Sequence, residues 1–198
     1  MNTFTDRLAP LAAKMSPTAT NMIRMDHTHV VATFHQFEAD TSPSSKRGIV
    51  NTVCVALEIH AQLEEEIFYP ALRAIAPDNE VVQKSVPEHD EMRRLIARLR
   101  AMEPGDAGYD DTFYELVRDV LHHVADEETV LLPVAERLLG DRVSELGAEM
   151  TKRRFQLATP RAGEIAGNMV RAMPATSMAV AAGGLLAGAL LVRRLSRR

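Results

Sequence analysis

The sequence predicts an all-α protein: an up-down-up-down four-helix bundle with an additional C-terminal helix and a hydrophobic tail helix. Two observations predict this fold class. Apolar residues recur at helical spacing in four successive segments between residues 18 and 138, separated by short breaks rich in proline, glycine or serine. The second pair of segments also repeats the pattern of the first pair, which indicates two similar helical hairpins.

The first two helices each start at a serine–proline pair. Residues 16–17 resemble an N-cap followed by proline at the first helical position, so this helix is expected to run to about Asp40. A turn at residues 42–45 should start the second helix. Pro70 should bend or end the second helix, because proline lacks the backbone N–H of the helical hydrogen bond.

The third helix should carry the apolar residues between Val82 and Leu99, with a kink near its start at Pro87. A glycine-containing loop at residues 104–108 separates it from the fourth helix. Thr112 and Glu115 have the spacing of a capping box, which predicts that the fourth helix begins there.

Three regions follow from these breaks. Residues 18–157 are expected to form one metal-binding bundle that includes a shorter fifth helix. Residues 158–174 contain scattered proline and glycine and predict a partly helical linker. Residues 175–192 carry no charged side chain and precede four closing arginines. At about 1.5 Å per residue this run just crosses a hydrocarbon core of roughly 30 Å, which predicts a transmembrane anchor.

The tail resembles the Gly-rich C-terminal anchors of small bacterial inner-membrane proteins. The resemblance implies a tail-anchored protein with its bundle in the cytoplasm. Gly184 and Gly188 form a G-x-x-x-G that could pair two tails in a homodimer. The alternative is an alanine-rich helix packed on the bundle of a soluble cytoplasmic protein.

Composition excludes several classes of function. The formal net charge is −4, which gives no electrostatic support for binding nucleic acid. Cys54 is the single cysteine, so an internal disulfide and cysteine-rich metal sites are excluded. The seven histidines are the more informative residues.

Four of these histidines and two glutamates lie within the apolar stripes, and in each H-x-x-x-E pair the two side chains share one helix face. In an antiparallel bundle, residues equidistant from a turn lie side by side, so all six should meet at one level. Burying ionised glutamates alone would cost several kcal/mol, which metal cations would remove. The six are His27, His60, Glu64, His89, His123 and Glu127.

Four imidazoles and two carboxylates suit iron or manganese, with zinc also possible. The symmetric assignment gives each of two metals two histidines, with both glutamates bridging. Octahedral iron would then keep positions for water, hydroxide, oxo or a diatomic ligand.

The segments MDHTHVVATFHQFE, EIHAQLEEEIFYPAL, PEHDEMRRL and LHHVADEETVLLP resemble the haemerythrin-like (HHE cation-binding) family over about residues 18–157. The resemblance implies that the six residues bind a non-haem di-iron centre with an oxo or hydroxo bridge, manganese or zinc being less favoured. It implies binding of, or reaction with, oxygen, peroxide or nitric oxide, and in an enzymatic version peroxidase, catalase-like or nitric-oxide-reducing activity. Iron storage, iron donation and gas sensing without turnover are the alternatives.

One position departs from the oxygen-carrying haemerythrins, which have an additional histidine one turn after the third-helix histidine. Here that residue is Arg93. The departure favours sensing, peroxide or nitric-oxide handling, or iron supply over oxygen carriage, and leaves a place for another donor such as Tyr69. His35 could contribute near the site. The acidic residues next to the H-x-x-x-E pairs are expected to form a solvated face: Glu65, Glu66, Asp126 and Glu128.

Overall fold

The computed structural model describes residues 16–173, and in this part of the chain all regular secondary structure is helical, which confirms the predicted fold class. The helices are α2 (Ala19–Phe34), α3 (Pro43–Leu63), α4 (Tyr69–Arg73), α5 (Glu80–Ala101), α6 (Tyr109–Asp126), α7 (Leu132–Leu139), α8 (Arg142–Ala158) and α9 (Ala162–Ala172). Three short turns join some of them: the π-helical η1 (Glu64–Phe68) and η2 (Glu127–Leu131), and the 3-10 turn η3 (Thr159–Arg161).

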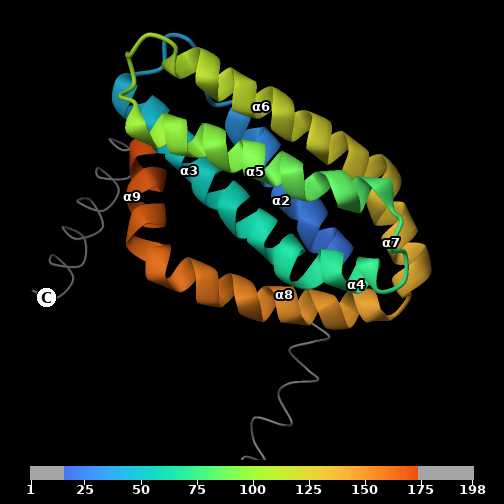
Figure 1. Cartoon of the computed structure of the whole chain (residues 1–198). Coiled ribbons are helices and arrows are strands. Elements are labelled where there is room, and N and C mark those ends of the chain that lie inside the picture. The colour runs from blue at the N-terminus through green and yellow to red at the C-terminus, as the bar shows by residue number, and fades with distance from the viewer. Residues whose placement is uncertain (1–15, 174–198) are drawn as a thin grey trace, which may run out of the picture.

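Four rods form the bundle (Figure 1). Two of them, α2 and α5, are single helices, and the other two are α3–η1–α4 and α6–η2–α7. Each composite rod widens into a π turn at the glutamate of its H-x-x-x-E pair and continues past a proline, Pro70 or Pro133. The wider turn accommodates the missing proline N–H and ring, so the rod passes Pro70 and continues to Arg73.

Several predicted boundaries differ from the observed ones. Thr18 rather than Ser16 caps α2, and its hydroxyl accepts the Asn21 N–H at 3.3 Å. Helix α2 ends at Phe34, short of Asp40, and the chain then turns so that Phe37 is buried.

The predicted capping box of the fourth helix is wrong. Helix α6 begins at Tyr109, after Gly108 in a left-handed conformation (φ 86°) that glycine adopts without strain. The Thr112 hydroxyl donates to the Gly108 carbonyl at 2.8 Å inside the first turn, so it caps no N–H group.

The core divides into two apolar clusters. One includes Ile23, Leu63 and Leu131, and the other includes Val30 and Leu57. Along α2 and along each composite rod, the predicted metal ligands lie in sequence between members of one cluster and members of the other. Hydrophobic burial therefore holds the helices together on both sides of a polar layer.

The C-terminal helices cover one side of the bundle. Helix α8 packs along α2 and α3, and α9 turns from its end to pack on α3 (Figure 1). Within the described part of the predicted linker, residues 158–173, most residues thus belong to η3 and the docked helix α9. A glycine makes this possible, because a Cβ at Gly48 would lie 2.5 Å from the Ala172 backbone nitrogen.

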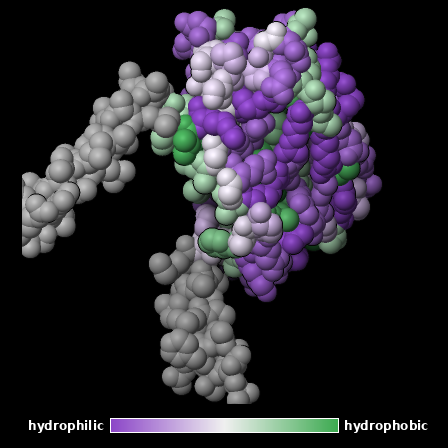
Figure 2. Space-filling model, turned by 90° about the vertical axis from the view of Figure 1, so that its left-hand side faces the viewer, coloured by the Kyte–Doolittle hydropathy of each residue, from purple (hydrophilic) through white to green (hydrophobic). Residues whose placement is uncertain are grey.

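Within residues 16–173 no helix combines the length and apolar character needed to cross a membrane. Hydrophilic residues cover most of the face in Figure 2, and hydrophobic residues appear there in small groups. The predicted anchor at residues 175–192 and its glycine pair lie outside the described residues, so they stay predictions.

The glycine contact predicts a stability change. We expect Gly48→Ala to destabilise the protein by about 1–3 kcal/mol, because the new methyl group would push the α9 backbone away from α3. Chemical denaturation measures the loss, and hydrogen exchange should localise it to α9. Gly163→Ala, where nothing lies within 4 Å of the added Cβ, is the control and should be neutral or stabilising. Equal stabilities for the two variants would contradict the close packing.

Candidate metal centre

The structure brings the six predicted side chains together in the polar layer. Helices α2, α3, α5 and α6 each contribute one histidine, and η1 and η2 contribute the two glutamates. All six are buried, with both glutamates fully inaccessible. Because each of the four rods supplies one histidine, the histidines meet only when all four rods have the correct axial register.

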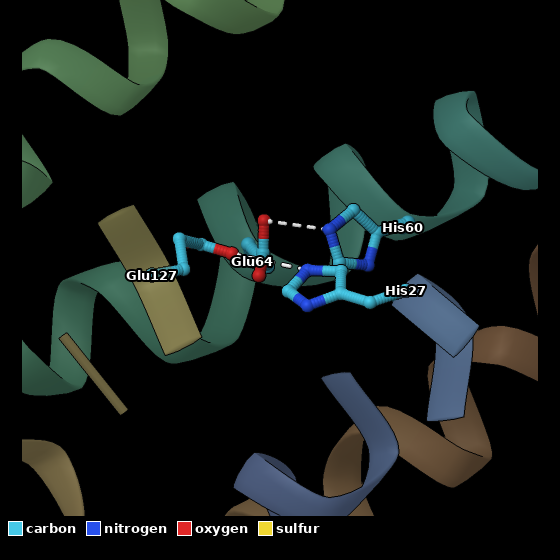
Figure 3. Close-up of side chains that lie close together, drawn as sticks. All are labelled: His27, His60, Glu64 and Glu127. Carbon is cyan, nitrogen blue, oxygen red and sulfur yellow. Dashed lines mark ion pairs between the residues drawn. The ribbon is translucent and has the colours of Figure 1, made fainter. Parts of the chain in front are cut away.

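The first group of donors consists of His27, His60, Glu64 and Glu127, whose nearest ligand atoms all lie within 4.8 Å of one another. Figure 3 shows the two imidazoles facing the two carboxylates from different helices. The His60 Nε2 atom lies 3.2 Å from Glu64 Oε2, and the His27 Nε2 atom lies 3.3 Å from Glu127 Oε2.

The second group consists of Glu64, His89 and His123, again with ligand atoms within 4.8 Å. The His89 Nε2 atom lies 3.4 Å from Glu64 Oε2, and the His123 Nε2 atom lies 3.5 Å from Glu127 Oε2. Each glutamate therefore contacts two histidines, one from each group of donors. Each carboxylate thus lies between the two donor groups, with its Oε2 atom close to a histidine of each.

Buried atoms without hydrogen-bond partners point to the same conclusion. They include Nε2 of His27 and His60, Oε1 of Glu64 and Oε2 of Glu127. Each unsatisfied buried polar group costs about 1–3 kcal/mol. Cations bound among these lone pairs would remove that penalty, so the donor set fits metal ions.

Burial and neighbouring groups shift the pKa values of several of these donors. Burial raises the pKa of Glu64 well above its usual value, and the Glu127 carboxylate adds to this shift. Burial also opposes the charge of Glu127, but the nearby His123 and His27 outweigh it and lower the pKa. The two carboxylates therefore differ: the pKa of Glu64 is raised and that of Glu127 is lowered. Burial lowers the pKa of His60 to about 4, which keeps that imidazole neutral.

His27 differs from His60. Burial opposes its charged form, but contact with Glu127 prevails and raises its pKa to about 8. A metal ion binding to Nε2 would displace this proton, because a coordinating imidazole must have a free lone pair.

The outer nitrogen of every histidine in the centre faces a carboxylate. This contact favours a proton on Nδ1 and turns the Nε2 atom toward the centre, as in carboxylate–histidine–metal sites. The Nδ1–oxygen pairs are His27–Glu128 at 2.9 Å, His60–Asp26 at 3.4 Å, His89–Glu65 at 2.8 Å and His123–Glu88 at 2.9 Å.

Glu65 and Glu128, predicted on a solvated acidic face, also contact histidines of the centre, and sequence reasoning missed this role for them and for Asp26 and Glu88. All four adjoin a predicted ligand in the sequence, which is the signal that could have found them. Each of them serves a histidine on a different rod.

Arg93 belongs to this outer layer. Its Nη2 atom donates to both oxygens of Glu65 at 2.7 and 2.8 Å, and Glu65 in turn holds His89. Arg154 from α8 donates to Asp26 through two nitrogens, Nη1 to Oδ1 at 2.7 Å and Nη2 to Oδ2, and Asp26 holds His60. The Arg93 side chain is thus linked to the centre through the Glu65 carboxylate.

Tyr69 lies directly against the centre and is fully buried. Its hydroxyl oxygen is 2.7 Å from Glu127 Oε1 and 3.0 Å from Glu64 Oε2. Burial and the two carboxylates raise the pKa of this phenol well above its usual value, so it stays protonated and donates. His35 lies elsewhere: it is exposed, and its ring contacts the Val31 carbonyl at 2.8 Å.

Two comparisons of the sequence find related proteins. The Hemerythrin HHE cation binding domain model matches residues 18–147. A DNA nickase of Nostoc sp. (strain PCC 7120) is 28% identical over 125 residues, which cover 63% of this chain and 35% of the relative.

A solved structure shares the fold. The crystal structure of a Hemerythrin HHE cation binding domain-containing protein from Mycobacterium kansasii matches with a TM-score of 0.63 at 18% identity, covering 79% of this chain and 99% of that one. The family model spans more than half of the sequence. The chain therefore belongs to the haemerythrin family of HHE cation-binding domains and carries clustered histidine and glutamate side chains that could hold metal.

Proposed function

We propose that this protein is a non-haem di-iron protein that binds or reacts with oxygen, peroxide or nitric oxide. The observation that carries the proposal is the pair of buried donor groups that share Glu64, with Glu127 contacting a histidine of each group. Iron in both positions would supply redox chemistry and open coordination sites. Manganese and zinc are the other metals that this donor set could hold.

The protein's own residues have separable roles in this proposal. The two glutamates would hold the ions at a fixed separation, and the four histidines would set their potential. The Tyr69 hydroxyl would donate a hydrogen bond to the glutamates or to a ligand beside them. The outer carboxylates would keep the imidazoles oriented and electron-rich.

The space beside the centre favours a very small ligand. A cavity of about 10 Å³ lies next to His27, His60 and His123, close to the volume that one water molecule needs. Its other walls are mostly apolar and include Leu57 and Met92. A space of this size favours the smallest ligands over larger organic substrates.

A second candidate function is iron storage or donation, or gas sensing, without turnover. The acidic residues around the centre favour it only weakly, because four of them already hold histidines. DNA nicking, named for the Nostoc relative, is not proposed, since the matched region is about a third of that protein and this chain has a net charge of −4.

Loss of a bridging glutamate should reduce the amount of metal that the protein binds. We expect Glu127→Gln to reduce bound iron from two ions per chain to at most one, because an amide cannot supply the anionic bridge. Elemental analysis of the purified protein measures this. Glu66→Gln is the control, since Glu66 is an exposed neighbour of the site that pairs with Arg153, and it should retain two ions. Two ions in Glu127→Gln would contradict the bridging role.

Loss of an outer carboxylate should weaken metal binding without removing a metal ligand. We expect Glu65→Gln to lower iron affinity by about 10–100-fold, the usual effect of losing such a partner. Competition with a chelator gives the affinity. Glu91→Gln, which disturbs only the surface pair with Arg94, should be unchanged. An unaltered affinity in Glu65→Gln would mean that the His89 contact does not tune the centre.

The ligand chemistry is tested by mixing iron-loaded protein with oxygen, nitric oxide or hydrogen peroxide. We expect the charge-transfer absorption of the iron-loaded protein to change, measured by stopped-flow spectroscopy, while zinc-loaded protein stays silent. Repeated peroxide consumption would identify an enzyme, and one stable change a carrier or sensor. No response to any of the three would favour iron storage and overturn the proposal.

A further inference from the structure

One carboxylate beside the metal centre is held by a helix outside the four-helix bundle. Asp26 accepts from both terminal nitrogens of Arg154, which belongs to α8. The buried Nε atom of the same guanidinium has no partner among the described residues, so Asp26 is the group that holds this side chain. Arg154 lies outside residues 18–147, the region that the family model matches. The contact therefore links the C-terminal part of the chain to the centre.

The packing of α8 along α2 brings Arg154 to this carboxylate (Figure 1). A Cβ at Gly147 would lie 2.1 Å from the Pro17 carbonyl oxygen and 2.9 Å from the Ala19 backbone nitrogen, so α8 touches the start of α2 there. About two turns further along each helix, Arg154 meets Asp26. Two contacts with the same spacing on both helices thus determine the register of α8 on α2.

The carboxylate that Arg154 holds also contacts a histidine of the centre. Asp26 Oδ2 lies 3.4 Å from His60 Nδ1 and accepts from Arg154 Nη2 as well. A carboxylate at Nδ1 favours a proton on that nitrogen and leaves Nε2 to face the centre. The Asp26 side chain is only 15% exposed, so without the arginine a mostly buried charge would lose its counter-ion. Turning toward water would then be favourable, because an unpaired buried charge is costly.

A second arginine makes the equivalent contact on the other donor group. Arg93 Nη2 donates to both oxygens of Glu65, and Glu65 contacts His89 Nδ1 at 2.8 Å. His60 belongs to one donor group and His89 to the other. Each arginine is therefore linked to one side of the centre, Arg154 from α8 and Arg93 from α5.

We propose that Arg154 is a positioning residue that couples the docking of α8 to the orientation of His60. Through Asp26 it keeps the Nε2 atom of this histidine facing the first donor group, and it does not act on His89. The orientation of His60 is a property of the protein without metal, whereas the effect on metal affinity rests on the proposed function. Such coupling is reciprocal, so metal binding at His60 would in turn stabilise the docking of α8.

Nitrogen-15 NMR of the histidine rings in the metal-free full chain at pH 7 tests the orientation directly. In Arg154→Gln we expect the ratio of the Nε2–H to the Nδ1–H form of His60 to rise about fivefold, the effect of losing one hydrogen bond. The His89 signals should stay as in the parent protein. Arg93→Gln should give the reverse pattern, with His89 changed and His60 unchanged.

Arg153→Gln is the matched control. Arg153 precedes Arg154 in α8 and has a similarly exposed side chain, 33% against 34%, but it pairs with Glu66 at the surface. Both histidine spectra should be unchanged in this variant. Arg154→Lys keeps the charge without the planar fork, so its His60 ratio should lie between those of the parent and Arg154→Gln. The lysine variant also supplies the test should Arg154→Gln fail to fold.

Zinc, a diamagnetic probe, tests the coupling from the other direction. We expect zinc to slow hydrogen exchange of the α8 amides in the parent protein and in Arg153→Gln, but not in Arg154→Gln. Chelator competition should show zinc affinity about 2–30-fold lower in Arg154→Gln.

A His60 spectrum that is unchanged in both Arg154 variants would overturn the positioning role. So would equal changes at His60 and His89, because they would indicate general loosening of the bundle. If the parent protein binds neither zinc nor iron, the proposed function fails, and the spectra of the metal-free protein still decide the role of Arg154.

Discussion

The burial of two glutamates among four imidazoles is the constraint on which the rest of the structure depends. A carboxylate without solvent is unfavourable when charged, and two carboxylates sharing one space repel each other. The protein offsets this in part through the Tyr69 hydroxyl, which lies 2.7 Å from Glu127 Oε1, and through His27, whose pKa the Glu127 contact raises to about 8. These are partial remedies, because Nε2 of His60 and Oε1 of Glu64 still lack a hydrogen-bond partner. Bound cations would satisfy these atoms, so the buried donor set fits metal ions.

The outer carboxylates connect the rods in a closed ring. Asp26 on α2 holds the histidine of α3, and Glu65 on the second rod holds that of α5. Glu88 on α5 holds the histidine of α6, and Glu128 on the fourth rod returns to that of α2. Each helix thus orients a donor on the next, and the orientation of every imidazole depends on bundle packing. Arg93 and Arg154 brace this ring from outside.

The helical repeat was enough to predict the bundle. It also predicted that His27, His60 and the other predicted ligands meet, because residues equally distant from a turn lie at the same level along the bundle axis. It could not show which carboxylate serves which histidine, since Glu65 and His89 lie on different rods and meet only through packing. Docking of α9 depends on the absence of a side chain at Gly48. The hydrophobic periodicity of the sequence does not indicate this close approach. Helix ends were missed where local turns, such as that at Gly108, override capping patterns.

Anomalous X-ray diffraction from crystals of the iron-loaded protein, recorded on both sides of the iron absorption edge, addresses the central claim most directly. The account predicts two anomalous peaks in the polar layer, one between His27 and His60 and one between His89 and His123, with Glu64 and Glu127 reaching both. A single peak, peaks at the protein surface, or an iron-free interior with the six side chains hydrogen-bonded to water would contradict it.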